Sequence, residues 1–110
     1  MSGWYELSKT SNGQFRFVLK AANAETILVS EQYTTHEAAK KGIASVQANS
    51  SLDERYDRKV AKDGKPYFNL KAANHQIIGT SEQYSTEAAR EKGIASVKSN
   101  GPTTVIKEKL

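Results

Sequence analysis

The sequence contains no cysteine, no long apolar run and only two histidines. Without cysteine the chain can form no disulfide, present no thiol nucleophile and bind no metal through thiolates. No apolar stretch approaches the length of a membrane-spanning helix, so we expect no contact with a membrane. The first residues, MSGWYELSK, contain neither a basic start nor an apolar run, which argues against secretion. Together these absences predict a protein of the reducing cytoplasm.

Familiar catalytic patterns are missing as well. His36 is expected in the first turn of a helix and His75 in a tight turn, and both positions are usually solvated. No pair of carboxylates has a familiar spacing, and the sequence has no Ser-His-Asp context or His-x-x-x-His helix pattern. Soft metal ligands and clustered acids are absent too. The sequence therefore predicts no enzyme, no catalytic residue, no metal site and no cofactor.

Length and composition favour one folded domain. The chain has 110 residues, of which 37% are hydrophobic and 25% are charged, values typical of a globular protein. Its net charge is +4 and its pI is near 9.3. A positive excess of this size permits an anionic partner without requiring one.

The most informative feature is a repeat. The segments SEQY, LKAAN and KGIASV each occur twice, at Ser30–Tyr33 and Ser81–Tyr84, Leu19–Asn23 and Leu70–Asn74, and Lys41–Val46 and Lys92–Val97. The members of each pair are 51 positions apart, and the copies share about 22 identities in 46 aligned positions. This pattern predicts a tandem duplication of one structural unit. A unit of about 50 residues is near the lower size limit for an independent core, so the two copies should share one.

Each copy is expected to form three strands. Hairpin signals at Asn12-Gly13 and Asp63-Gly64 separate alternating segments that are typical of half-buried strands. The expected strands are Trp4–Lys9, Phe15–Lys20 and Thr26–Val29 in the first copy and Tyr56–Val60, Pro66–Lys71 and Gln76–Thr80 in the second. Asn23 and Asn74 are expected to hold turns between strands, because asparagine tolerates the left-handed region.

A helix follows the strands in each copy. Thr34 with Glu37 forms a capping box, and Ser85 is the matching cap in the second copy. The apolar spacing predicts inner helix faces made of Ala38, Ala39, Gly42, Ile43 and Val46 in the first copy and Ala89, Gly93, Ile94 and Val97 in the second. Glycine within a helix costs about 1 kcal/mol relative to alanine, so Gly42 and Gly93 indicate a close approach of helix to sheet. The alternative ends each helix just before these glycines.

The predicted fold is α+β: a tandem β-β-β-α repeat with pseudo-two-fold symmetry, in which an antiparallel sheet of six strands carries two helices on one face. Residues 1–101 form a single domain of two repeats, 4–50 and 55–101, joined by a linker at 50–54. Residues 102–110 are expected to be a frayed C-terminal tail. The other face of the sheet is then either solvated or covered by a partner.

Residues identical in both copies are first of all residues that the unit needs in order to fold. We therefore interpret LKAAN, SEQY and KGIASV as structural, with Tyr33 and Tyr84 seating an aromatic ring where strand passes into helix. The exception would be a two-fold site that uses both copies symmetrically.

The two-copy layout, with WYELSK, FRFVLKAAN, YFNLKAANHQIIG and GIASVKSN in this order, resembles the YegP-like family of small bacterial proteins, in its duplicated subfamily. The resemblance covers residues 1–101. It implies tandem β-β-β-α repeats and a cytoplasmic bacterial source. Single-copy relatives in that family fit a picture of this chain as the covalent version of a homodimer. The family has no established biochemical function, so the resemblance implies no catalytic or binding residue.

The uncovered sheet face is the best candidate for binding, through Arg16, Lys20, Tyr67, Asn69 and Lys71. Basic side chains beside aromatic rings can neutralise phosphates while bases of a single strand stack. The same residue types are common on strands that simply face water. Weak binding of single-stranded nucleic acid is thus one hypothesis for this face.

Protein–protein association is the other hypothesis. Val18, Leu28 and Ile77 would share the uncovered face with Tyr67, and such an apolar patch could bury against a protein partner or a second copy of the chain. The response to salt separates the two hypotheses, since phosphate contacts weaken steeply as salt rises. The sequence therefore predicts a non-enzymatic binding or interaction domain and does not name its ligand.

Overall fold

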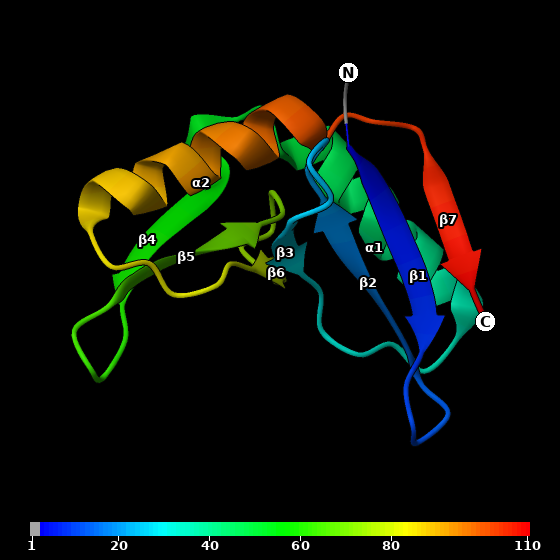
Figure 1. Cartoon of the computed structure of the whole chain (residues 1–110). Helices are drawn as coiled ribbons and strands as arrows, with labels where there is room; N and C mark the ends of the chain where they lie inside the picture. Colours follow the sequence, from blue (N-terminus) through cyan, green and yellow to red (C-terminus); the bar gives the residue numbers. More distant parts are fainter. Residues whose placement is uncertain (1–2) are drawn as a thin grey trace.

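Seven strands form a single mixed sheet in the order β4-β5-β6-β3-β2-β1-β7, with β4 and β7 at its edges (Figure 1). The computed structural model describes residues 3–110. The first repeat contributes β1 (Trp4–Lys9), β2 (Phe15–Lys20), β3 (Thr26–Val29) and helix α1 (His36–Asn49). A short 3₁₀ helix, η1 (Asp53–Arg55), leads to β4 (Tyr56–Val60), β5 (Pro66–Lys71), β6 (Ile77–Thr80), helix α2 (Glu87–Asn100) and β7 (Ile106–Lys109).

Alternation of apolar and polar residues decides which face of the sheet each strand buries. In β2, Phe17 and Leu19 are buried beneath the helices, while Arg16 on the opposite face is exposed. The hairpins that join β1 to β2 and β4 to β5 turn at Gly13 and Gly64, whose φ angles are +82 and +85 degrees. Glycine adopts this left-handed backbone without the steric cost that a side chain adds. The strand periodicity and the turn glycines read from the sequence are therefore both present.

The two repeats meet at the centre of the sheet, where β3 and β6 run antiparallel and pair at Val29 and Thr80. Each helix crosses this boundary, because α1 packs on β2, β5 and β6, and α2 packs on β5, β2 and β3. Both helices cover the same face, which confirms the predicted α+β class. A single core results, and its largest fully buried side chains are Tyr5, Leu7, Phe17, Leu19, Leu28, Ile43, Val46, Phe68, Leu70, Ile94 and Val97.

The inner faces of the helices follow the predicted spacing with two differences. The buried residues of α1 are Ala39, Gly42, Ile43 and Val46. Ala38 and Ala89, which were expected on these faces, are only half-buried. In α2 the position equivalent to Ala39 is Arg90, which is 9% exposed and whose Nη1 donates to the Lys59 carbonyl at 3.2 Å. The second helix therefore buries a charged side chain with its own hydrogen-bond partner.

A reciprocal pair of tyrosine hydrogen bonds ties each repeat to the helix of the other. The Tyr5 hydroxyl donates to the carbonyl of Gly101, just after α2, at 2.6 Å. The equivalent Tyr56 hydroxyl donates to the carbonyl of Ser50, just after α1, at 2.5 Å. Burial raises the pKa of both hydroxyls above the ordinary value, so they stay protonated and keep donating. These bonds satisfy two helix-end carbonyls, which have no partner within their own helix.

Two contacts join residues at equivalent positions of the repeats and therefore lie on the pseudo-two-fold axis. A Cβ atom on Gly79 would lie 2.5 Å from Cδ2 of Leu28. A Cβ atom on Gly101 would lie 2.3 Å from Oγ of Ser50, a residue that was expected in the linker and is fully buried. In both contacts the first repeat supplies a side chain and the second a glycine. Close packing leaves room for only one side chain where equivalent positions meet.

The C-terminal tail is the main departure from expectation. Residues 102–110 were expected to fray, but they include β7, which pairs in parallel with Tyr5–Ser8 of β1. The sheet therefore has seven strands and is mixed, rather than six-stranded and antiparallel throughout. Without β7 the backbone groups of β1 would form an open edge. Ile106 packs against the core from this position, and Glu108 Oε1 lies 2.8 Å from Nε2 of His36 in α1.

Each helix is capped one residue later than predicted. The caps are Thr35 and Thr86, whose hydroxyls each accept the backbone N–H three residues on, at 3.0 Å. The prediction of Thr34 and Ser85 was wrong, because the capping residue must have extended backbone and Thr35 and Thr86 have it. The repeat contained the signal, since threonine is identical at the true cap positions and differs at the predicted ones.

We predict that Gly79→Ala destabilises the domain by about 1–2 kcal/mol, because the new methyl group overlaps the fully buried Leu28 side chain. Urea unfolding measures this change. In a Leu28→Ala background the same substitution should be neutral or stabilising, since the obstructing side chain is gone and a strand prefers alanine to glycine. Equal costs in both backgrounds would contradict the axial contact.

We predict that ending the chain after Thr104 destabilises it by about 1–3 kcal/mol, since the β1 edge loses its backbone partners. Trp4 is a built-in reporter, because Lys107 Nζ lies 4.3 Å from its ring centroid. Its emission should shift to the red in the truncated chain. As a control, Lys107→Met should change Trp4 emission at a cost below about 1 kcal/mol. An unchanged urea midpoint and spectrum on truncation would show that β7 is not docked in solution.

Candidate functional site

The five predicted binding residues lie on the uncovered face of the sheet. Arg16, Lys20, Tyr67, Asn69 and Lys71 alternate with the helix-facing residues of β2 and β5, so their side chains share the opposite face. The strands β3 and β6 separate β2 from β5. The five residues therefore form two groups on either side of the sheet centre rather than one cluster.

Two of the five are held by other side chains. Asn69 is 6% exposed, and its Oδ1 accepts from the Thr80 hydroxyl at 2.9 Å. Lys71 Nζ lies 3.1 Å from Oδ2 of Asp57 and holds the pKa of that carboxyl below its usual value. Arg16 is exposed and forms no ion pair within residues 3–110. The hydrogen-bonding and charged groups available for a ligand are thus fewer than the sequence suggested.

The same face carries cations that the sequence analysis missed. Residues paired directly across neighbouring strands share a face, which places Lys59, Lys107 and Lys109 beside the predicted residues. The strands then present Arg16, Lys20, Lys59, Lys71, Lys107 and Lys109 against the carboxylates of Glu6 and Asp57. This excess of four positive charges equals the net charge of the whole chain, +4. Lys107 and Lys109 were missed because the tail was expected to fray.

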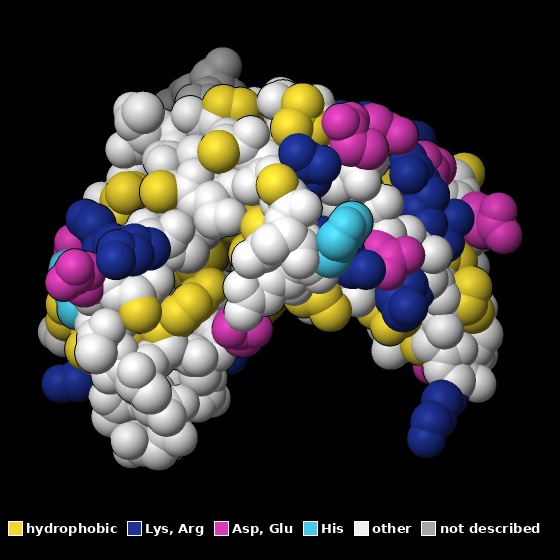
Figure 2. All heavy atoms as spheres, turned by 180° about the vertical axis from the view of Figure 1, so that it is seen from behind, with side chains coloured by type: hydrophobic (Ala, Val, Ile, Leu, Met, Phe, Trp, Pro, Cys, Tyr) yellow, Lys and Arg dark blue, Asp and Glu magenta, His cyan; other side chains and the backbone are white. Residues whose placement is uncertain are grey.

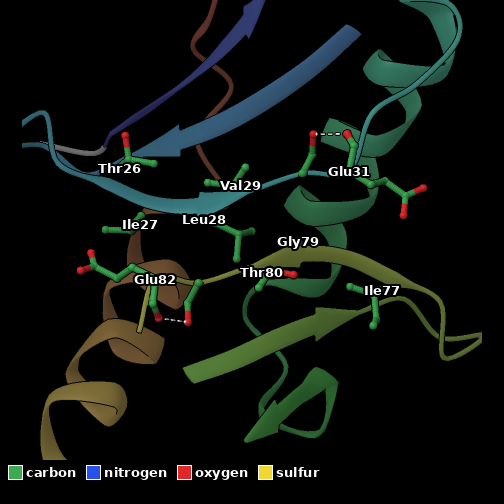
Figure 3. Close-up of a pocket in the computed structure, with 11 residues that line it drawn as sticks. Thr26, Ile27, Leu28, Val29, Glu31, Ile77, Gly79, Thr80 and Glu82 are labelled. Atoms are coloured by element: carbon green, nitrogen blue, oxygen red, sulfur yellow. Dashed lines mark hydrogen bonds between the residues drawn. The ribbon is translucent and has the colours of Figure 1, made fainter. Parts of the chain in front are cut away.

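A groove of about 720 Å³ lies across the centre of the sheet. Its walls are β3 with the following residues to Glu31, and β6 with the following residues to Glu82, as Figure 3 shows. Val29 and Thr80 line it from the uncovered face, since they pair with Val18 and Asn69. Five of its eleven lining residues are aliphatic or glycine: Ile27, Leu28, Val29, Ile77 and Gly79. Leu28, which was expected on the uncovered face, pairs with the helix-facing Leu19 and is 1% exposed.

Each end of the groove combines a lysine with a carboxylate. At one end Lys20 of β2 pairs with Thr26 of β3. Glu82, which follows the antiparallel strand β6, lies at the same end. The equivalent residues of the other repeat form the other end: Lys71, Ile77 and Glu31. In Figure 1, β3 and β6 lie between the two hairpins, and Figure 2 shows the molecule from behind as an arch that is hollowed between two projecting ends.

Two smaller crevices, of about 240 and 230 Å³, are built at the helices. Each forms where the turn between the second and third strands of one repeat meets the helix of the other. The α2 crevice is lined by Ala21, Asn23, Glu25 and Ile27 of the first repeat and Glu82, Tyr84, Ala89, Lys92, Gly93 and Ser96 of the second. The α1 crevice is lined by the ten equivalent residues with the repeats exchanged, and by Ile77. Such a pair is the two-fold arrangement that the sequence analysis named as an exception.

A tyrosine ring fixes the shape of each crevice. Tyr33 stacks on Phe17 with ring centroids 6.1 Å apart, and a Cβ atom on Gly42 would lie 2.4 Å from its hydroxyl oxygen. In the other repeat, a Cβ atom on Gly93 would lie 2.1 Å from the hydroxyl oxygen of Tyr84. The helix glycines therefore make room for a tyrosine and not, as predicted, for the backbone of the sheet. Both helices continue past the glycine, which removes the alternative of a glycine cap.

The two tyrosine hydroxyls retain free hydrogen-bonding capacity. Neither Tyr33 nor Tyr84 has a side-chain hydrogen bond to another residue within 3–110, although both rings are half-buried. Burial is the main cause that raises the pKa of both hydroxyls, and the carboxylates of Glu31 and Glu82 add to it. Both hydroxyls are therefore protonated at neutral pH and able to donate to a ligand.

The asparagines at the crevice mouths hold their turns by a different route from the one predicted. The side-chain oxygens of Asn23 and Asn74 accept the backbone N–H two residues on, both at 3.1 Å. The left-handed residues are the next ones, Ala24 and His75, each with a φ of 70 degrees. The turn uses the oxygen of each asparagine, and the amide nitrogen has no hydrogen bond to the part of the chain that the structure describes, so it can donate to a ligand.

The described residues contain no group of three or more His, Asp or Glu side chains that could hold a metal ion. Over the same residues, the helices are too short or too polar to cross a bilayer. His36 pairs with Glu108 at the surface, and His75 is exposed in its turn.

Comparison with known proteins gives a consistent result. Residues 10–57 and 61–108 each match the model of a family described as a domain of unknown function, DUF1508. A UPF0339 protein of Shewanella oneidensis is 66% identical over 108 residues, which cover 98% of each chain. The UPF0339 protein YegP of Escherichia coli strain K12 is 63% identical over 108 residues, again 98% of each chain.

Solved structures agree with the fold. The solution NMR structure of the E. coli protein YegP, described as a protein of unknown function, superimposes with a TM-score of 0.94 and 62% identity over 99% of this chain and 94% of that chain. The solution NMR structure of the UPF0339 protein from Shewanella oneidensis gives a TM-score of 0.92 and 66% identity over 98% and 92% of the two chains.

We predict opposite stability effects for two substitutions at one crevice. Gly93→Ala should destabilise the domain by about 1–2 kcal/mol, although alanine gains helix propensity, because the methyl group overlaps Tyr84. Tyr84→Phe should change the urea midpoint little, since the hydroxyl has no hydrogen-bond partner among residues 3–110 to lose. A stable Gly93→Ala variant, or a large loss for Tyr84→Phe, would contradict this account of the crevice.

Proposed function

The chain belongs to the DUF1508 family of UPF0339 proteins, and we propose that it is a non-enzymatic binding domain that takes an acidic, apolar segment of a protein partner on its uncovered sheet face. The observation that carries the proposal is the groove of about 720 Å³ across β3 and β6. Apolar side chains that bind in a concave site with an aliphatic floor are removed from water, and this burial contributes favourably to the free energy of binding. The proposal also places the protein in the cytoplasm, because the chain has no cysteine.

Charge supports an acidic partner. The strands that flank the groove carry a positive excess, and Lys20 and Lys71 stand directly beside its lining residues. Complementary charge at the rim speeds association and selects a partner, while the apolar floor supplies affinity. A segment with leucine or valine at its centre and carboxylates at its ends satisfies both parts of the surface.

Several features favour a protein segment over nucleic acid. Positive charge stands at the two ends of the groove, where Glu31 and Glu82 also lie, so the groove suits a few separate carboxylates near Lys20 and Lys71 better than the continuous negative charge of a phosphate backbone. The Trp4 ring, which could stack a base, is covered by the ammonium group of Lys107. Tyr67 remains as a half-buried ring on this face. A single ring and an aliphatic floor suit a peptide better than a run of bases.

A selection experiment tests the proposal. The full-length chain is immobilised, a phage library of random peptides is selected on it, and selected peptides are titrated into labelled protein by amide-resolved NMR. We expect peptides rich in Asp or Glu with Leu, Val or Ile, and shifts at the amides of Val29 and Thr80. Lys20→Gln with Lys71→Gln should weaken such a peptide about tenfold, because Lys20 loses a charge pair with the peptide and loss of Lys71 leaves the Asp57 carboxylate uncompensated on the same face.

The matched control is Lys62→Gln with Lys65→Gln, which removes the same charge at the exposed β4–β5 hairpin tip and should leave affinity unchanged. Failure to enrich peptides, or shifts that map away from β3 and β6, would overturn the proposal. Binding of a mixed single-stranded oligonucleotide at these amides, lost steeply with salt, would assign the face to nucleic acid instead.

A further inference from the structure

The two helix crevices are nearly identical, although the repeats that build them have diverged. Of the ten positions that both crevices share, nine have the same residue, and the tenth is Glu25 in the α2 crevice and Gln76 in the α1 crevice. Across the whole alignment the copies share about 22 of 46 positions. Apolar and glycine positions in a crevice are explained by packing, but the exposed charges are not. Packing therefore does not explain why both repeats keep the same charged groups in their crevices.

Ion pairs do not provide that explanation. Most surface charges that form ion pairs differ between the repeats: Arg58 corresponds to Leu7, Glu91 to Lys40, and Lys98 to Gln47. Glu31, Glu82, Lys41 and Lys92 are the reverse case. They are identical in both repeats, exposed, and without an ion pair to any residue in 3–110. Ion pairing within residues 3–110 therefore does not account for the charges that both repeats keep.

We propose that each crevice binds a small zwitterion of the α-amino acid class that carries a short aliphatic side chain. A glutamate and a lysine share each crevice without pairing with each other, so an ammonium group and a carboxylate on one ligand can bind both. This ligand site is distinct from the groove on the uncovered face, although Glu31 and Glu82 border both.

The chemistry of the α2 crevice assigns a role to each polar group. Lys92 binds the ligand carboxylate, and the free Tyr84 hydroxyl and the Asn23 amide nitrogen donate to it. Glu82 binds the ammonium group. The aliphatic side chain lies against Ile27 and the neighbouring alanines, which supply the apolar wall.

The size of the crevices fits this class. Volumes of about 230 and 240 Å³ hold a molecule of amino-acid size and exclude a nucleotide or a folded segment. The one differing position predicts unequal affinities. The α2 crevice has an additional carboxylate, Glu25, where the α1 crevice has Gln76, so the ligand ammonium group is attracted more strongly to the α2 crevice.

An NMR titration of the full chain with L-valine tests the proposal, with the amides of Gly42 and Gly93 reporting the two crevices separately. We expect saturable shifts at both, with a Kd of about 1 mM or lower and about threefold tighter binding at Gly93. Isobutylamine and 3-methylbutanoate are the matched controls, since each is valine without one of its two charges. Each should bind at least about tenfold more weakly.

Substitutions in one crevice use the other as an internal control. Lys92→Met should weaken valine at the Gly93 reporter about tenfold and leave the Gly42 reporter unchanged. Glu25→Gln should make the two affinities equal, because it converts the α2 crevice to the polar composition of the α1 crevice. Tyr84→Phe should weaken binding at Gly93 while the urea midpoint stays the same.

The proposal is overturned by no saturable shift with valine, by an equal response to either singly charged control, or by no effect of Lys92→Met at Gly93. These results are independent of the peptide experiment, since the reporters there are Val29 and Thr80 on the other face. A valine response confined to Val29 and Thr80 would also overturn it, because the ligand would then occupy the groove.

Discussion

Each helix packs on strands of both repeats, and the rest of the structure depends on this packing across the boundary between the repeats. A repeat of this size buries too little apolar surface by itself, so its helix face and its sheet face are completed by the other copy. The reciprocal hydrogen bonds of Tyr5 and Tyr56 fix the two helix ends to the opposite repeat. The groove exists because the repeats join at β3 and β6, and the crevices exist because a turn of one repeat meets a helix of the other. Every candidate site is therefore a product of the interface between the copies.

The sequence predicted what depends on local pattern. Alternation placed Arg16 on the correct face, and the spacing of 51 residues identified the repeat. It failed where an outcome depends on a distant partner. The segment Ile106–Lys109 has one apolar residue and three charged ones, and only the open edge of β1 makes it a strand. Likewise, no local pattern shows that Asp57 pairs with Lys71, because the register of β4 on β5 decides it. The crevices were anticipated only in general terms, as a two-fold site that would be an exception to a purely structural role for the repeated segments. A sequence does not show which of its charged side chains lack a partner.

The groove and the crevices are adjacent sites that share lining residues. Glu31 lines the groove and the α1 crevice, and Glu82 lines the groove and the α2 crevice. A charge bound on one side of either carboxylate alters the field on the other side, where exposed charges interact over roughly a Debye length of 8–10 Å. Occupancy of a crevice by a zwitterion thus has an electrostatic path to the surface on which a protein segment would lie.

The axial contacts have a consequence for how such a chain can change over time. In a symmetric dimer a residue on the two-fold axis meets its own copy, so any substitution there is made twice and against itself. Covalent linkage removes that restriction, and here Leu28 faces Gly79 while Ser50 faces Gly101. Two first halves would bring two leucines into the space of one, and two second halves would leave glycine opposite glycine with a void between them. The two repeats are therefore no longer interchangeable: in a linked chain, one repeat supplies the side chain at each axial contact and the other supplies the glycine that makes room for it.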